Sequence, residues 1–214
     1  MAVEKFENEK WQGKKQGINF RLQTALEFID KGPVLDLGCG DGIFLQLLKE
    51  KGIKGQGLDI SEVAVQKAKS QGLLVEQFDF SQKPLPFADN SFAAVVLLDV
   101  LEHLYQPKDI LQEAARLADE LIVAVPNFNS LPARLQTLLG RVPENNLPKK
   151  GHIYWFNLSV LSEILQNSGW KIIELKTNTI FNNRPLLGHF FTLLANLLPN
   201  VFALSFVVKA RKYG

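Results

Sequence analysis

The sequence predicts an α/β fold in which helices cover both faces of a mostly parallel sheet. Strand-like apolar runs alternate with helical patterns over residues 33–125, which is typical of βαβ units. A glycine-rich turn connects the first run to the first helix, and right-handed crossovers then place helices on both faces. The 214 residues, 46% of them hydrophobic, are enough to bury the core of one domain over 1–214.

Each element is predicted from its apolar pattern and from the residues that end it. Strands are expected at 33–37, 54–58, 73–78, 93–98 and 121–125, with helices between them at 41–51, 61–70 and 107–119. The second half departs from this alternation. It predicts a helix at 157–168 ended by Gly169, a strand at 170–175 and a last strand at 204–210. An amphipathic helix is expected at 17–31.

The run 34–42, Val-Leu-Asp-Leu-Gly-Cys-Gly-Asp-Gly, predicts a strand, a sharp turn and the start of a helix. Gly38 and Gly40 allow the turn and leave room for a ligand to approach the backbone. The helix that follows has free N–H groups that favour negative charge. A dinucleotide fingerprint needs a third glycine at position 43, which is Ile43. The run therefore indicates a cofactor loop of another kind, and an ordinary strand-to-helix turn is the alternative.

Acidic residues follow the next two strands. Asp59 ends the second strand about twenty residues downstream, where a carboxylate can accept hydrogen bonds from both hydroxyls of a ribose. A helix begins at 60–62, so a helix N-cap is the alternative role for Asp59. Asp79 and Phe80 follow the third strand, and Asp79 alone could be a turn residue.

Together these motifs resemble, in order and spacing, those of class I S-adenosylmethionine-dependent methyltransferases. The stretch 85–104 resembles the family's fourth strand and the helical turn after it, although Ala93 stands where the family often has Asp. The resemblance implies a Rossmann-like, doubly wound, mostly parallel seven-stranded sheet with an antiparallel last strand. It also implies that S-adenosylmethionine is the cofactor.

The resemblance assigns a part of the cofactor to each motif. The glycine loop would wrap the methionyl part, Asp59 would bind the ribose, and Asp79 and Phe80 would contact the adenine amino group and ring. Residues 1–31 are expected to form a helical cover, and Cys39 is expected to be structural. The predicted cofactor-binding residues are Asp36, Gly38, Cys39, Gly40, Asp59, Ile60, Asp79, Phe80, Leu98 and His103.

The substrate side should involve 99–105 and two insertions, 126–156 and 177–199, which face a substrate or a partner. Phrases at 125–128, 138–143, 151–156 and 198–202 resemble the MetW group, which is linked to methionine biosynthesis. The alternative for 126–156 is a helix that merely covers the sheet. This segment mixes aromatic and basic side chains suited to an acidic, partly apolar metabolite or a protein surface: Phe128, Tyr154, Trp155, Arg134, Arg141, Lys149 and Lys150.

The apolar stretch 186–198 is too short to span a bilayer, which takes about 20 apolar residues. We expect it to be a packed helix of the core, and the alternative is a lid or a partner surface.

Methyl transfer asks mainly for in-line positioning of the acceptor, and for a base only when the acceptor must lose a proton. No catalytic residue is fixed by the sequence. His152 is the first candidate for a base and His103 the second, with a structural histidine as the alternative.

Composition argues against several other classes of protein. A single cysteine excludes an intramolecular disulfide, and the three histidines show no metal-ligand spacing, so no metal site is predicted. The net charge is +2 and its basic residues are interleaved with acids, which argues against nucleic acid as a partner. The charged N-terminal region lacks the apolar core of a signal peptide, so we expect a cytoplasmic protein without a membrane span.

Two functions remain open. The first is methyl transfer to a small-molecule substrate through an oxygen, nitrogen or carbon atom. The second is a MetW-like regulatory role, in which the chain binds S-adenosylmethionine and contacts a protein partner in methionine biosynthesis. The acceptor and the oligomeric state are not predicted.

Overall fold

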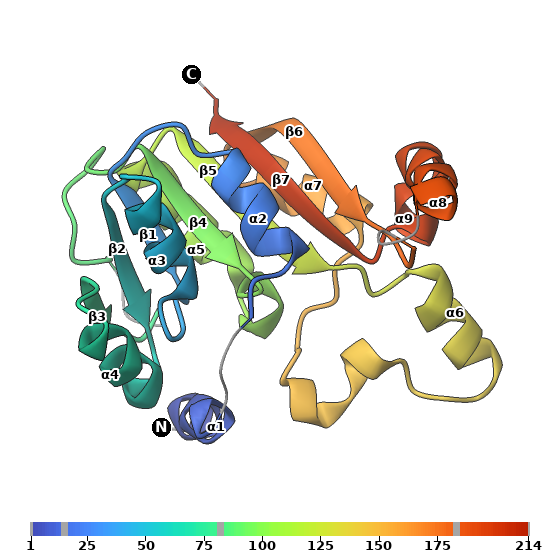
Figure 1. The fold of residues 1–214 in the computed structure, drawn as a ribbon, viewed down its shortest axis with the longest axis horizontal. Coiled ribbons are helices and arrows are strands. Elements are labelled where there is room, and N and C mark those ends of the chain that lie inside the picture. Colours follow the sequence, from blue (N-terminus) through green and yellow to red (C-terminus); the bar gives the residue numbers. More distant parts are fainter. Residues whose placement is uncertain (1, 14–16, 81–83, 182–184, 214) are drawn as a thin grey trace.

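A seven-stranded sheet forms the centre of the computed structural model, which describes residues 2–13, 17–80, 84–181 and 185–213 (Figure 1). The strand order is β3-β2-β1-β4-β5-β7-β6, and β7 runs antiparallel to both β5 and β6. The predicted Rossmann-like sheet with an antiparallel last strand is therefore confirmed. The strands are β1 (Val34–Leu37), β2 (Gly55–Asp59), β3 (Val75–Gln77), β4 (Ala94–Leu98), β5 (Glu120–Pro126), β6 (Trp170–Asn178) and β7 (Ser205–Lys212).

Helices cover both faces of this sheet because the central strands are apolar on both sides. In β4, Val95 and Leu97 belong to one buried cluster, whereas Ala94 and Val96 belong to the other. The first cluster also contains α5 (Pro107–Leu117) and α7 (Leu158–Gln166). The second contains α2 (Phe20–Glu27), α3 (Ile43–Glu50) and α4 (Glu62–Ser70). The remaining elements are α1 (Ala2–Trp11), α6 (Leu131–Leu138), α8 (Pro185–Leu197), α9 (Pro199–Phe202) and the short 3-10 helices η1 (Leu101–His103), η2 (Glu144–Asn146) and η3 (Pro148–Lys150).

The helix predicted at 17–31 is shorter than expected. It is α2, which begins after Asn19, whose side-chain oxygen accepts hydrogen bonds from the N–H groups of Arg21 and Leu22 at 2.9 and 3.2 Å. Its apolar side packs on the sheet through the buried residues Leu22 and Ala25. A separate helix, α1, precedes it.

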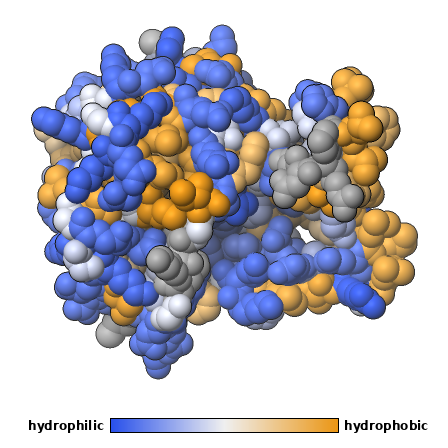
Figure 2. All heavy atoms as spheres, in the orientation of Figure 1, coloured by the Kyte–Doolittle hydropathy of each residue, from blue (hydrophilic) through white to orange (hydrophobic). Residues whose placement is uncertain are grey.

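The apolar stretch 186–198 does not form the core helix that we expected. It belongs mostly to α8, in which Leu186 is 90% exposed and Leu197 is 68% exposed, while Ala195 is fully buried. Leu138 of α6 is 81% exposed. Figure 2 shows apolar residues gathered on the side of the molecule where α6 and α8 lie in Figure 1.

Within the described residues, no helix combines the length and the apolar character that crossing a membrane requires. The cytoplasmic location stays a prediction.

Candidate active site

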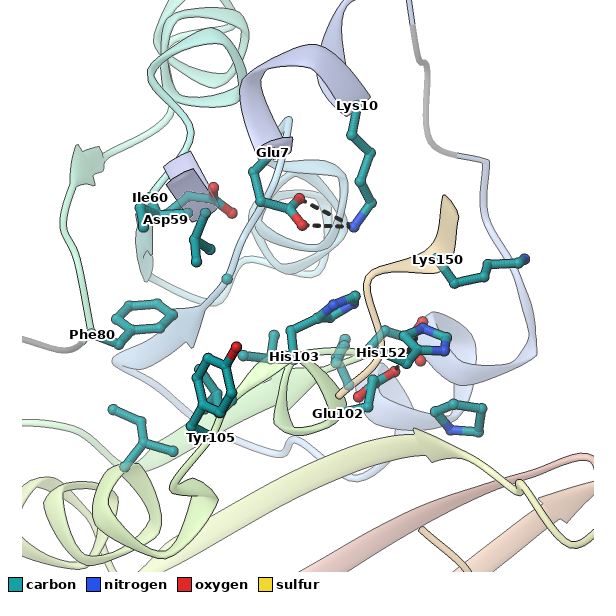
Figure 3. Close-up of a pocket in the computed structure, with 18 of the residues that line it drawn as sticks. Glu7, Lys10, Asp59, Ile60, Phe80, Glu102, His103, Tyr105, Lys150 and His152 are labelled. Atoms are coloured by element: carbon teal, nitrogen blue, oxygen red, sulfur yellow. Dashed lines mark hydrogen bonds and ion pairs between the residues drawn. The ribbon is translucent and has the colours of Figure 1, made fainter. Parts of the chain in front are cut away.

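A pocket of about 770 Å³ opens where β1, β2, β3 and β4 end, at their carboxyl ends (Figure 3). The chain crosses from one side of β1 to the other at this edge, because β2 and β4 are its two neighbours. Ligands of doubly wound sheets bind at such a switch in strand order. The volume is within the usual range of small-molecule sites.

Seven of the ten predicted cofactor-binding residues line this pocket: Gly38, Asp59, Ile60, Asp79, Phe80, Leu98 and His103. The other three, Asp36, Cys39 and Gly40, are not among the lining residues. Asp36 and Cys39 are 3% and 4% exposed and lie behind the wall. The contact of the ten residues with a cofactor stays a prediction, whereas the gathering of seven of them around one pocket is an observation.

The glycine loop is closely packed against protein side chains. Gly38 has a φ of +79°, and a Cβ there would collide with the side chain of Val100. Gly40 has a φ of +55°, and a Cβ there would collide with the ring of Trp11. The N–H groups of Gly38 and Cys39 both donate to the carbonyl of Leu58, at 2.7 and 3.2 Å. These contacts hold the loop against the end of β2.

Asp59 connects the glycine loop to the start of α4. Its Oδ2 accepts a hydrogen bond from the N–H of Gly40 and its Oδ1 accepts one from the N–H of Ser61, both at 2.8 Å. Ser61 is the N-cap of α4, because its Oγ accepts from the N–H of Ala64. The alternative of Asp59 as the N-cap is therefore wrong. Each carboxylate oxygen keeps a second lone pair for a ligand.

Burial raises the pKa of three side chains around the glycine loop. The pKa of Asp59 is raised, mainly by burial, although the two backbone N–H groups oppose the shift. Burial and the charge of Asp59 raise the pKa of Asp36 to about 8. Burial likewise raises the pKa of the Cys39 thiol, which agrees with a structural role for this residue.

The helix that lies over the pocket is α1, which contributes Val3, Glu7, Lys10 and Trp11 to its lining. It is docked on α4, because Asn8 Oδ1 accepts hydrogen bonds from Ser61 Oγ at 2.8 Å and from the N–H of Val63 at 3.2 Å. The helix at 17–31, which was expected to contribute to the cover, supplies only Arg21 to the pocket. The charged sequence of α1 has no apolar stripe by which it could have been predicted.

A cluster of Glu102, His103 and His152 occupies the part of the pocket away from Asp59 and Phe80 (Figure 3). The potential ligand atoms of the three side chains lie within 4.8 Å of one another. Glu102 is 1% exposed, and its Oε2 accepts no hydrogen bond from the described residues. Burial, together with the charge of Asp99, raises its pKa well above the usual range. His152 is far from η1 along the chain, so the spacing of these residues in the sequence does not predict the cluster.

Backbone hydrogen bonds bring the two parts of the cluster together. The carbonyl of Glu102 accepts from the N–H groups of Ile153 and Tyr154, at 2.9 and 3.0 Å. Nδ1 of His103 lies 3.0 Å from the carbonyl of Gly151. These contacts fasten the end of the 126–156 segment to η1 and place His152 in the pocket.

His152 has a pKa lowered mainly by burial, so its imidazole is neutral near pH 7. Its Nδ1 lies 2.7 Å from the carbonyl of Asn145, and its Nε2 lies 4.0 Å from Oε1 of Glu102. The role of His152 as a base stays a prediction.

The two insertions differ in their relation to the pocket. The segment 126–156 supplies Pro126, Asn145, Lys149, Lys150 and His152 to its lining. No described residue of 177–199 does so, and its role at a substrate or partner stays a prediction. Helix α6 buries only Ala133, whereas Phe128 and Phe156 of the same segment belong to the core. Whether 126–156 faces a substrate or partner or merely covers the sheet stays a prediction.

Comparison with known proteins gives a family and a group of relatives. The family described as methionine biosynthesis protein MetW matches residues 20–168. The ubiquinone biosynthesis O-methyltransferase of Azoarcus is 25% identical over 197 residues, which cover 85% of this chain and 78% of that protein. The enzyme of the same name from Coxiella burnetii is 28% identical over 194 residues, which cover 83% and 81%.

Solved structures share the fold. Magnesium protoporphyrin IX methyltransferase from Synechocystis, solved with bound S-adenosylhomocysteine, gives a TM-score of 0.69 at 19% identity and covers 99% of both chains. A methyltransferase from Thermotoga maritima, described as a possible histamine N-methyltransferase, gives a TM-score of 0.65 at 19% identity and covers 91% of this chain and 90% of that one.

Proposed function

Since the chain belongs to the MetW family and is a class I S-adenosylmethionine-dependent methyltransferase, we propose that it methylates an oxygen atom of a small molecule. The observation that carries this proposal is the convergence of Gly38, Asp59, Asp79 and Phe80 on one pocket from the ends of three strands. The curated relatives are named O-methyltransferases, which supports oxygen as the acceptor atom. They also favour an enzyme over the regulatory role that the sequence left open.

The residues present fit the cofactor. Both oxygens of Asp59 are oriented by backbone N–H groups and keep lone pairs that ribose hydroxyls can use. Phe80 offers an apolar ring face beside the carboxylate of Asp79, as an adenine with its amino group requires. When bound, S-adenosylmethionine supplies the activated methyl group, so the protein needs no nucleophile of its own.

The chain contributes positioning and exclusion of water. Helix α1 lies over the pocket through Trp11 and Lys10, while the end of the 126–156 segment closes the side that carries His152. An acceptor held between these two walls is fixed relative to the methyl donor, which is the main requirement of methyl transfer. The basic residues Lys149 and Lys150 on that side suit an acceptor that carries negative charge elsewhere.

Calorimetry with purified protein tests the cofactor. We expect S-adenosylmethionine and S-adenosylhomocysteine to bind with one site each and NAD not to bind measurably. Transfer of a radiolabelled methyl group to hydroxyl, carboxyl and amine compounds then tests the acceptor. Binding of NAD without either methionyl ligand would refute the proposal, and transfer to amines alone would refute the choice of oxygen.

The partner in methionine biosynthesis, which the MetW resemblance implies, stays a separate proposal. The exposed leucines of α6 and α8 are the surface on which we place it. Co-purification with wild-type protein, compared with a Leu138→Ser, Leu186→Ser variant, tests it. Equal capture by both proteins, or by neither, would contradict this surface.

A further inference from the structure

The cluster of Glu102, His103 and His152 has the composition of a metal site, and we propose that it binds a divalent transition-metal ion with the preferences of Zn²⁺. Two imidazoles and one carboxylate form a ligand set known from catalytic zinc sites, where further positions stay open for water or substrate. Imidazole favours such ions over Mg²⁺ and Ca²⁺, which prefer oxygen ligands. The cluster lies in the lining of the pocket, so a ligand can reach it.

The hydrogen bonds of the histidines support this role. Nδ1 of His152 lies 2.7 Å from the carbonyl of Asn145, and Nδ1 of His103 lies 3.0 Å from that of Gly151. A carbonyl oxygen only accepts, so each Nδ1 carries the proton and each Nε2 keeps its lone pair. A backbone carbonyl that orients the second nitrogen is the usual support of a histidine ligand.

Glu102 supplies the independent observation. It is buried to 1% exposure, yet Oε2 accepts no hydrogen bond from the described residues. A buried carboxyl oxygen without a partner is costly, and a bound metal ion would supply that partner. The other oxygen of this carboxyl group, Oε1, lies 4.0 Å from Nε2 of His152.

Three basic side chains of the pocket lining have acidic partners. Arg21 pairs with Asp99 at 2.9 Å, Lys10 with Glu7 at 3.1 Å and Lys150 with Glu144 at 3.7 Å. These three cations are therefore already engaged in ion pairs, whereas Oε2 of Glu102 has no hydrogen-bond partner among the described residues.

Binding requires a small contraction of the cluster. The ligand atoms lie within 4.8 Å of one another, whereas tetrahedral Zn²⁺ with bonds of about 2.0–2.2 Å holds its ligand atoms about 3.3–3.6 Å apart. Side chains must therefore move by about an ångström. The backbone hydrogen bonds from Ile153 and Tyr154 to Glu102 keep the two segments in place during this change.

The ion would determine which acceptors react, and this part rests on the proposed function. A hydroxyl bound to the ion loses its proton more readily, which makes its oxygen a better nucleophile at neutral pH. The proton leaves to water, the oxygen electron pair forms the new bond to the methyl carbon, and the carbon–sulfur bond breaks with its electron pair remaining on sulfur. The substrate class is then a small molecule with a hydroxyl group that can reach both the ion and the methyl donor.

Zinc titration of the full chain tests the site without depending on activity. Protein freed of metal by a chelator is titrated with Zn²⁺ in competition with a chromophoric chelator, and in parallel with Mg²⁺. We expect one Zn²⁺ per chain, and affinity at least about tenfold weaker in Glu102→Gln and in His152→Gln, because loss of an orienting partner alone costs 10–100-fold. His189→Gln is the matched control, since His189 lies on α8 and its loss should leave the affinity unchanged.

Thermal melting shows that each variant is folded. Zn²⁺ should raise the melting temperature of the wild type and of His189→Gln, but not of Glu102→Gln or His152→Gln. Absence of a stoichiometric Zn²⁺ site in the wild type, or undiminished affinity in both ligand variants, would overturn the proposal. Failure of the methyltransferase function is distinguishable, since Zn²⁺ would still bind while S-adenosylhomocysteine would not. If His152→Gln lost methyl transfer but kept wild-type Zn²⁺ affinity, His152 would be a base and not a ligand.

Discussion

Replacing Asp59 with asparagine separates the observed role of this carboxylate, which holds the glycine loop, from its proposed role in binding the ribose. In the protein without ligand, its two oxygens accept hydrogen bonds from Gly40 and Ser61. Asparagine keeps the shape but has one oxygen, so one of these buried N–H groups faces an amide NH₂. A buried donor without an acceptor costs about 1–3 kcal/mol. For a domain of this size each kcal/mol lowers the melting temperature by about 2–4 °C, so we expect a loss of about 2–12 °C.

Asp59→Asn should also weaken cofactor binding, and by more than a loss of stability alone would. A carboxylate that accepts hydrogen bonds from ribose hydroxyls contributes about 1.5–3 kcal/mol, so Asp59→Asn should weaken S-adenosylhomocysteine by about tenfold to over a hundredfold. Calorimetry well below the melting temperature measures this affinity in folded protein. Asn157→Ala is the matched control, because it removes the N-cap of α7 and costs about 0.5–2 kcal/mol away from the pocket.

The reasoning is refuted if Asp59→Asn melts at a lower temperature but binds S-adenosylhomocysteine as tightly as the wild type. Asp59 would then only hold the glycine loop, and the ribose contact would belong to another residue. Equal weakening in Asn157→Ala would show that general instability, and not the lost carboxylate, explains the result.

Three further outcomes follow from burial and close packing. The pKa of Asp36 is raised to about 8, so the stability gained by keeping this carboxyl protonated is lost as the pH rises through 8. The melting temperature of Asp36→Asn relative to the wild type should therefore be higher at pH 9 than at pH 5. A difference that does not change with pH would contradict this. Gly40→Ala should lose about 1–2 kcal/mol in denaturant unfolding, from its positive φ alone, and more from its collision with Trp11. Part of that loss should disappear in a Trp11→Ala background, whereas strict additivity would argue against the contact. Leu138→Ser and Leu186→Ser should each change the free energy of unfolding by less than about 0.5 kcal/mol, and a loss above 2 kcal/mol would mean that these side chains are covered in solution.

The sequence alone was sufficient for the sheet and for one half of the pocket. The strands were predictable because their apolar runs are local, and a run that is apolar on both sides implies cover on both faces. Asp59, Asp79 and Phe80 were predictable for a related reason. Residues that follow parallel strands meet at one edge of the sheet whatever the loops do, so order along the chain determines their neighbours.

Only the tertiary structure determined the other half of the pocket. Helix α1 lies over the pocket because Asn8 binds the start of α4, a contact between residues more than fifty positions apart. Glu102 and His152 lie close together because the long segment 126–156 returns to η1, where backbone hydrogen bonds hold its end. The burial of a hydrophobic residue likewise depends on the partners that pack against it. The stretch 186–198 therefore resembled a core helix in the sequence, whereas α8 exposes most of its leucines in the structure. Local pattern determines which segments form strands, whereas the closing of loops determines which distant side chains share a site.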